Sequence, residues 1–179
     1  MPIRVTSILL AILTLLSLSL TASVPAQQTT YQEDFEDGQA QGWELQPGWQ
    51  VTALNGNTVL AGAGHNWAYS GWTYDGDLRI AFRLMLVAGR IHINVRQTEA
   101  SRYFIGFETT GSDISKQYFP DDFREHLAFS NRAHGLNQWF QVEVVITGNR
   151  IDFFVDGIQE FTYTDLQALP SGILAFETI

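Results

Sequence analysis

The chain has 179 residues, of which 45% are hydrophobic and 13% aromatic, and a formal net charge of −9. This length suits one domain with a short leader, and the apolar content supports a substantial core, which excludes a chain disordered throughout. The acidic balance argues against nucleic acid and anionic membranes as main partners. Because cysteine is absent, a disulfide framework and a lipid anchor on an N-terminal cysteine are both excluded.

Residues 1–26 have the three parts of a secretory signal peptide. Arg4 supplies the positive charge, residues 8–20 form the apolar segment, and small residues precede a cleavage site after Ala26, with Ala22 as the alternative. An uncleaved membrane anchor is disfavoured, because the apolar run is shorter than the ~20 residues of a spanning helix. The sequence therefore predicts a secreted protein, extracellular or periplasmic, whose mature domain, residues 27–179, has no membrane contact.

An acidic segment opens this domain. Residues 31–36 are predicted to form the first strand, followed by a turn at residues 37–38. The carboxylates of Asp34 and Glu36 are ligands of the kind that Ca²⁺ takes, although Ca²⁺ needs about 6 to 8 oxygens from several segments. We therefore favour an edge strand protected by charge, with no cofactor, and keep a Ca²⁺ site at these two residues as the alternative.

Short β-strands are predicted at residues 43–45, 49–53, 58–61, 114–119 and 173–177, between turns that contain glycine or proline. Residues 123–129 suit either a strand or a short helix capped by Asp122. The histidines show no metal-ligand spacing.

Four aromatic residues crowd a short run of the chain: Trp67, Tyr69, Trp72 and Tyr74. Exposed rings of this kind stack on sugar rings, while their polar edges form hydrogen bonds. Burial in the core is the more common fate of such rings in a sandwich. Trp67 is nevertheless kept as a candidate stacking surface.

Residues 77–97 are predicted to form a hairpin that turns at residues 88–89 and pairs Leu86 with Ile91, Leu84 with Ile93 and Phe82 with Val95. The opposite face of this hairpin, extended by the next strand, carries the candidate ligand-binding residues Arg83, His92, Asn94, Arg96, Phe104 and Glu108. Arginine presents a planar fork of donors that suits carboxylates and vicinal hydroxyls. The alternative is an ordinary solvated sheet face, on which Glu108 pairs with Arg90.

The clearest pattern lies in residues 138–176. A two-residue turn at residues 148–149 pairs Ile146 with Ile151, Val144 with Phe153 and Val142 with Val155, so the large aliphatic partners share one face. After the next turn, at residues 156–157, a simple register sets Phe153 against Glu160. Either a β-bulge intervenes or both faces of these strands are partly covered.

No catalytic motif is present. The chain lacks the paired carboxylates of jelly-roll glycoside hydrolases, a nucleophile elbow, a phosphate-binding glycine loop and a zinc-binding helix motif. Glu108 and His92 are the candidates for acid and base in a site assembled from separate strands. The sequence thus favours a non-catalytic protein and leaves this alternative open.

The segments QWFQVEVVITGNRIDFFVDG, YTD and LPSGILAFE, with DFEDG near the start, resemble concanavalin A-like lectin and glucanase domains. Laminin-G-like modules and the 3-keto-disaccharide hydrolase-like domain of secreted bacterial proteins belong to this group. The resemblance implies an all-β, two-sheet antiparallel jelly-roll sandwich. It also implies one further strand beyond Ile179, without which the sandwich lacks its last strand and a Ca²⁺ site near Asp34 is in doubt. The glucanase carboxylate motif is missing, so that activity is not carried over.

These observations predict a secreted, non-catalytic carbohydrate-binding or adhesion module with a glycan ligand. Two alternatives stay open. One is a glycoside or 3-keto-glycoside hydrolase domain, and the other is a structural or protein-interaction module of a larger envelope protein, with further domains or proteins as partners.

Overall fold

The computed structural model describes residues 30–179, so the predicted signal peptide lies outside the described range. Within this range, Glu33–Ile179 is one compact unit that holds thirteen strands. Their bounds are β1 (Trp43–Leu45), β2 (Trp49–Leu54), β3 (Asn57–Gly62), β4 (Asn66–Tyr74), β5 (Leu78–Met85), β6 (Ile91–Gln97), β7 (Ser101–Glu108), β8 (Gly111–Tyr118), β9 (Phe123–Ser130), β10 (Trp139–Thr147), β11 (Arg150–Val155), β12 (Ile158–Thr164) and β13 (Gly172–Thr178). Residues 30–179 contain no helix that could cross a membrane.

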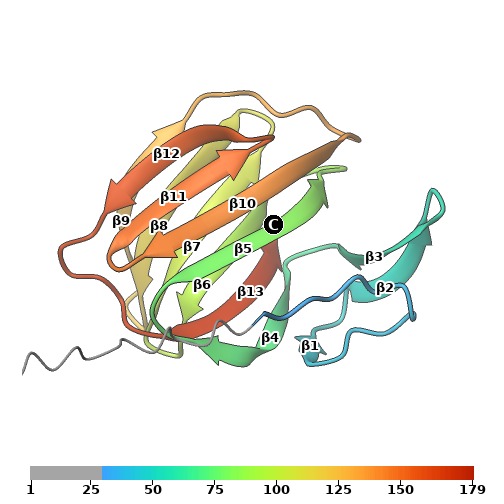
Figure 1. Ribbon diagram of the computed structural model, residues 1–179, viewed down its shortest axis with the longest axis horizontal. Coiled ribbons are helices and arrows are strands. Elements are labelled where there is room, and N and C mark those ends of the chain that lie inside the picture. The colour runs from blue at the N-terminus through green and yellow to red at the C-terminus, as the bar shows by residue number, and fades with distance from the viewer. Residues whose placement is uncertain (1–29) are drawn as a thin grey trace, which may run out of the picture. The chain divides into compact units, whose positions relative to one another are not determined.

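The strands form two facing sheets and one separate hairpin. The larger sheet has the order β1-β4-β13-β6-β7-β8-β9, and the smaller one has the order β12-β11-β10-β5. Figure 1 shows the four-stranded sheet in front of the seven-stranded sheet, with the β2–β3 hairpin beside them. Every pairing is antiparallel. The predicted two-sheet antiparallel sandwich is confirmed.

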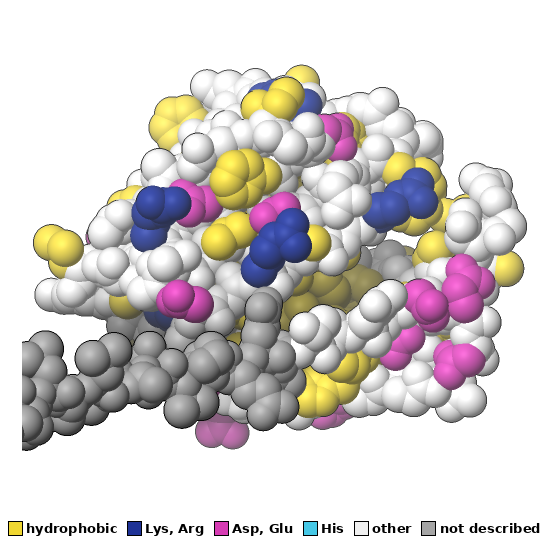
Figure 2. Space-filling model, in the orientation of Figure 1, with side chains coloured by type: hydrophobic (Ala, Val, Ile, Leu, Met, Phe, Trp, Pro, Cys, Tyr) yellow, Lys and Arg dark blue, Asp and Glu magenta, His cyan; other side chains and the backbone are white. Residues whose placement is uncertain are grey.

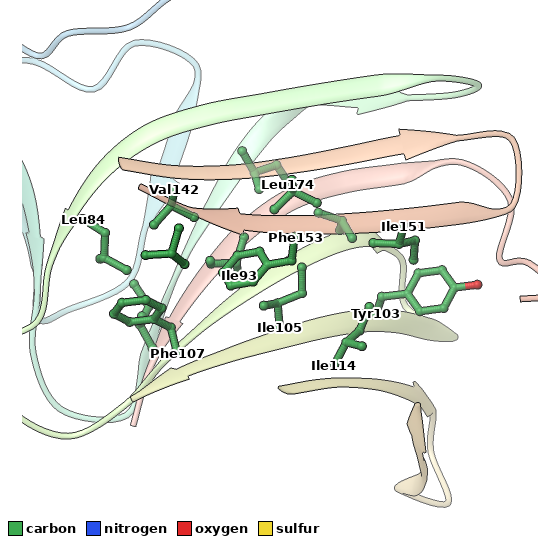
Figure 3. Packing of buried hydrophobic residues seen from close by; sticks show 14 of the residues in the cluster. Leu84, Ile93, Tyr103, Ile105, Phe107, Ile114, Val142, Ile151, Phe153 and Leu174 are labelled. Atoms are coloured by element: carbon green, nitrogen blue, oxygen red, sulfur yellow. The ribbon is translucent and has the colours of Figure 1, made fainter. Parts of the chain in front are cut away.

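The core fills the space between the two sheets. Ile93 and Ile105 from the larger sheet and Val142 and Phe153 from the smaller one are fully buried, and Figure 3 shows their side chains pointing toward one another. Alternate residues of a strand point to opposite faces. One face of each sheet is therefore apolar, and burial of each large side chain stabilises the fold by about 1.5–3 kcal/mol.

The β10–β11 hairpin has the predicted register. Val142 lies opposite Val155, Val144 opposite Phe153 and Ile146 opposite Ile151. The register then shifts between Phe153 and Phe154 where β11 pairs with β12. A bulge therefore resolves the predicted conflict.

The predicted hairpin over residues 77–97 is wrong. β5 pairs with β10 in the smaller sheet, whereas β6 pairs with β13 and β7 in the larger sheet. The segment between β5 and β6 therefore crosses from one sheet to the other. Both strands turn their apolar residues to the same core from opposite sides, so alternation in the sequence cannot tell this arrangement from a hairpin.

Two further predictions concern the local structure of short segments. Residues 31–36 form no strand, and Phe35 has a φ of 60°, so the predicted first strand is wrong. Positive φ breaks an extended strand. Residues 123–129, for which strand and helix were both open, lie in strand β9.

Two buried polar clusters fix loops, the first against the larger sheet and the second against β12 of the smaller sheet. In the first, the Asp165 carboxylate accepts hydrogen bonds from Lys116 Nζ at 2.7 Å and from the Tyr103 hydroxyl at 2.6 Å. In the second, Glu160 Oε1 accepts from Arg132 Nη1 at 3.0 Å and lies 2.8 Å from His134 Nε2. Buried charges are tolerated when they are paired and hydrogen-bonded, as they are here.

Candidate ligand-binding face

The outward face of the seven-stranded sheet carries a dense group of polar and aromatic side chains. Because Ile91, Ile93 and Val95 point into the core, His92 and Asn94 of the same strand point away from it. The cross-strand pairing sets Glu177 of β13 between His92 and Trp67. We call this group the polar face, which consists of His65, Trp67, Tyr69, His92, Asn94, Arg102, Phe104, Gln117 and Glu177.

Arg102 lies at the centre of the polar face and is 4% exposed. Its Nε donates to Gln117 Oε1 at 2.6 Å, and its Nη1 donates to Asn94 Oδ1 and to Glu177 Oε2, each at 2.8 Å. These partners come from three other strands of the sheet. The guanidinium is therefore fixed in position and orientation.

Aromatic rings enclose the same guanidinium. The Arg102 Cζ lies 4.8 Å from the centroid of the Trp67 ring and 4.9 Å from that of Phe104. Trp67 in turn stacks on Tyr69, with centroids 5.4 Å apart and an interplanar angle of 4°. The rings of Trp67 and Tyr69 are only half-buried. Cation–π contacts of this kind strengthen when the cation is desolvated.

Glu177 supplies the negative charge of the polar face. Burial alone would raise the pKa of its carboxyl, but hydrogen bonds from His92, His65 and Arg102, together with the charge of Arg102, lower that pKa to about 2. The distances to Oε2 from His92 Nδ1 and Arg102 Nη1 are each 2.8 Å. Glu177 is therefore ionised throughout the physiological range.

His92 is neutral in this network. Its Nε2 accepts a hydrogen bond from Arg90 Nε at 3.1 Å, which leaves the proton on Nδ1, where it is donated to Glu177. Burial lowers the pKa of the imidazole, and the nearby charges of Arg90 and Arg102 lower it further, against the opposing effect of Glu177. Both ring nitrogens are occupied by protein partners.

Arg90 joins the polar face to a neighbouring polar pocket of about 360 Å³. Besides His92, it donates to Glu108 Oε1 at 3.1 Å and to Asp113 Oδ1 at 2.5 Å. The guanidinium lies across Gly106, where a Cβ would overlap it. The predicted pairing of Glu108 with Arg90 is thus present.

The structure brings together only part of the predicted ligand set. His92, Asn94, Phe104 and Trp67 all lie on the polar face, whereas Glu108 lies at its edge with Arg90. Two arginines are elsewhere.

Arg83 lies on the outward side of the four-stranded sheet, over the ring of Trp139 at 4.8 Å. Arg96 lies at a bulge with a φ of 50° and donates to the carbonyls of Leu169 at 2.6 Å and Gly148 at 2.9 Å. Arg83 is therefore separated from the polar face because β5 and β6 belong to different sheets. Arg96 holds two loops together instead of facing solvent.

The alternative calcium ligands serve the backbone. Asp34 Oδ1 accepts from the backbone N–H of Glu36 at 3.0 Å, and Glu36 Oε1 accepts from that of Thr58 at 3.1 Å. Within residues 30–179, no group of three or more His, Asp or Glu side chains is arranged to hold a metal ion. These carboxylates do not fit a Ca²⁺ site, which requires several converging oxygens.

The alternative acid and base, Glu108 and His92, both bind the guanidinium of Arg90. A general acid or base must place its titrating atom within reach of the substrate. Both ring nitrogens of His92 are hydrogen-bonded to protein groups. Glu108 and His92 therefore hold the Arg90 guanidinium in place. The arrangement suits fixed hydrogen bonding better than proton transfer.

Sequence reasoning missed Glu177, Gln117 and His65. Glu177 follows Leu174 and Phe176 in the predicted last strand, where it occupies the position that alternates with the core-facing residue. In β8, Lys116 lies opposite the core residue Tyr103, so the next residue, Gln117, faces outward opposite Arg102. The pattern could thus have assigned both to the outward face, but the meeting of β13 with β6 was required to bring Glu177 to Arg102.

The sequence matches no known protein-family profile and no curated protein. Among solved structures, the chain is similar to the carbohydrate-binding module CBM66 from Bacillus subtilis, with 14% identity over 76% of this chain and 87% of that chain and a TM-score of 0.63.

A protein of unknown function with a galectin-like fold from Bacillus subtilis is also similar, with 10% identity over 76% of this chain and 82% of that chain and a TM-score of 0.61. The Bacillus licheniformis β-glucanase is 13% identical over 80% of this chain and 82% of that chain, with a TM-score of 0.56. The fold is an antiparallel jelly-roll sandwich, as the sequence resemblance implied.

Proposed function

We propose that this protein is a secreted, non-catalytic carbohydrate-binding module and that its polar face binds the glycan. The observation that carries the proposal is the Arg102 guanidinium, held between the rings of Trp67 and Phe104 while its N–H groups bind Glu177, Asn94 and Gln117. These network residues are themselves buried, so the network is a rigid support that holds the half-buried rings of Trp67 and Tyr69 and the exposed His65 at the surface. Preorganised groups of this kind lower the entropic cost of binding.

The half-buried rings of Trp67 and Tyr69 offer the apolar contact. Their planes are nearly parallel, and the Arg102 guanidinium lies against the Trp67 ring. A sugar ring presents C–H groups to an aromatic face and hydroxyls at its edge, which suits an aromatic surface with polar groups beside it. His65, whose side chain is 69% exposed, and Glu44, opposite Tyr69, lie where such hydroxyls would be.

The electrostatics favour binding over hydrolysis on this face. Glycoside hydrolysis needs one carboxyl with a raised pKa to protonate the leaving group. The pKa of Glu177 is lowered to about 2, so it cannot act as that acid at neutral pH. The similarity to CBM66, a carbohydrate-binding module, supports the same choice.

A glycoside hydrolase is the second candidate, favoured by two observations. Glu108 and Asp113 both line the polar pocket next to Arg90, and the β-glucanase from Bacillus licheniformis shares the fold. Release of reducing sugar from a glycan panel by the purified protein, lost in Glu108→Gln, would support this candidate and contradict the first.

The test of binding is affinity electrophoresis against a panel of soluble polysaccharides. We expect retardation by at least one polysaccharide, and we expect Trp67→Ala to weaken it by about tenfold, a difference of about 1.4 kcal/mol. Phe154→Ala is the matched control, because Phe154 is a half-buried ring on the outward face of the other sheet. Equal loss in both variants, or retardation unchanged by Trp67→Ala, would remove the polar face as the binding surface.

A further inference from the structure

A cleft of about 990 Å³ lies between strand β5 and strand β3. Figure 2 shows hydrophobic side chains in the hollow between the body of the sandwich and the β2–β3 hairpin. β5 is the last strand of the four-stranded sheet, and residues of β6 and β13 in the larger sheet also reach the cleft. The cleft is separate from the polar face, which is formed by the outward side of the seven-stranded sheet.

The cleft is bounded by the edges of two strands. It is lined by consecutive residues of β5, Ala81 to Met85, and by consecutive residues of β3, Asn57 to Gly62. A cleft that touches only one face of a strand would contact alternate residues. Contact with consecutive residues therefore indicates that the cleft runs along the edges of both strands. From β2, which pairs with β3 on its far side, only the two end residues Trp49 and Leu54 reach the cleft.

Neither edge has a β-sheet partner within residues 30–179. β5 pairs only with β10, and β3 pairs only with β2. The backbone N–H of Thr58 donates instead to the side chain of Glu36 at 3.1 Å, so it points away from β2. Because directions alternate along a strand, the N–H groups of Leu60 and Gly62 point to the same open edge.

The floor of the cleft is the margin of the hydrophobic core. Leu60, Phe82 and Phe176 line it and are packed against the core while remaining partly exposed. Trp49 also lines it, is 8% exposed, and has an indole N–H without a hydrogen-bond partner in the described part of the chain. The floor of the cleft is therefore largely apolar.

We propose that this cleft accepts one extended β-strand of a partner polypeptide, which pairs with β5 on one side and with β3 on the other. Such a strand satisfies both open edges with its own N–H and C=O groups. Its alternate apolar side chains cover the floor, and the inserted strand joins the hairpin to the four-stranded sheet. An acyl chain would cover the same floor but would leave both rows of backbone groups unpaired.

Charge selects a basic strand. The charged residues that line the cleft are the acidic Glu33, Asp34 and Glu36 and the basic Arg83 and Arg90, and Figure 2 shows acidic side chains gathered on the side of the hairpin. The whole chain carries a formal net charge of −9. The outward-pointing residues of the partner strand are therefore lysine, arginine or neutral polar residues, and pairing along β3 spans about six residues at ~3.3 Å each.

The test uses a probe of this chemistry, an acetylated and amidated octapeptide in which valine alternates with lysine and threonine. Titration followed by amide NMR and hydrogen exchange is expected to slow exchange at Leu60 and Gly62 of β3 and at alternate residues of β5. A matched peptide that is N-methylated at alternate residues keeps every side chain but cannot pair with one edge. We expect it to bind at least about tenfold more weakly.

The protein variant Leu60→Asp places a charge on the cleft floor and is expected to abolish peptide binding. Gln50→Asp, at an exposed position of β2, is the control that keeps it. Equal affinity for the methylated peptide, absence of binding at millimolar peptide, or protection confined to other strands would overturn the proposal. Concentration-dependent dimerisation in sedimentation that is lost in Leu60→Asp would also overturn it, because the occupant would then be a second copy.

Discussion

Replacement of Glu177 by glutamine tests the central ion pair of the polar face. The change keeps the size of the side chain but removes its charge, so Arg102 stays buried, at 4% exposure, without a counterion. Removing one partner of a buried ion pair costs about 3–5 kcal/mol. We therefore expect Glu177→Gln to lower the free energy of unfolding at pH 7 by about 3 kcal/mol.

The pH dependence of the free energy of unfolding gives a second, independent value for the contribution of Glu177. The pKa of Glu177 falls from its usual value of 4.5 to about 2 in the folded protein, which corresponds to about 3 kcal/mol at roughly 1.4 kcal/mol per pKa unit. Because the folded value is the lower one, this stabilisation is complete above about pH 4.5 and is lost as the pH falls toward 2. The variant lacks the titrating group and lacks this part of the dependence.

The assay is urea unfolding, followed by tryptophan fluorescence, of wild type and Glu177→Gln at several pH values between 7 and 2.5. Other carboxyls titrate in both proteins, so the difference between the two free energies isolates Glu177. We expect this difference to be about 3 kcal/mol at pH 7 and to shrink below pH 4.5. A difference that stays constant across this range would refute the electrostatic account of the polar face.

Three further substitutions and one control test other parts of the structure by the same unfolding assay. Gly106→Ala places a methyl group where a guanidinium lies and is expected to cost about 1–3 kcal/mol; a neutral result would show that the arginine is not fixed there. Lys116→Met leaves the buried Asp165 carboxylate without its cation and is expected to lower the free energy of unfolding by about 3–5 kcal/mol. A decrease of less than about 1 kcal/mol would contradict this expectation. Ile105→Ala, at a fully buried position, is expected to cost about 2–5 kcal/mol, whereas Ile158→Ala, at a 52% exposed position, should change stability by less than about 0.5 kcal/mol.

Local pairing could be predicted where the turn and the apolar pattern agree. In β10 and β11, a two-residue turn at Gly148 fixes the register, and each large aliphatic residue then meets another. The same logic failed for β5 and β6, because Leu84 and Ile93 face one core from two sheets. Alternation reports which face of a strand is buried, but it does not report which strand lies beside it.

The candidate site shows the same limit. His92 and Asn94 could be assigned to an outward face from alternation with Ile93. The centre of that face, where Arg102 meets Glu177, joins residues separated by 75 positions and depends on β13 lying beside β6. Sequence spacing alone does not carry such a contact, because it arises from sheet topology.

The measurement that tests the proposed function most directly is a titration of the protein with a polysaccharide that retards it, followed by the indole N–H signals of its five tryptophans. Trp67 lies on the polar face and Trp139 on the outward side of the other sheet. The account predicts a saturable shift of the Trp67 signal with the Trp139 signal unchanged. A shift of Trp139 while Trp67 stays unchanged would contradict it.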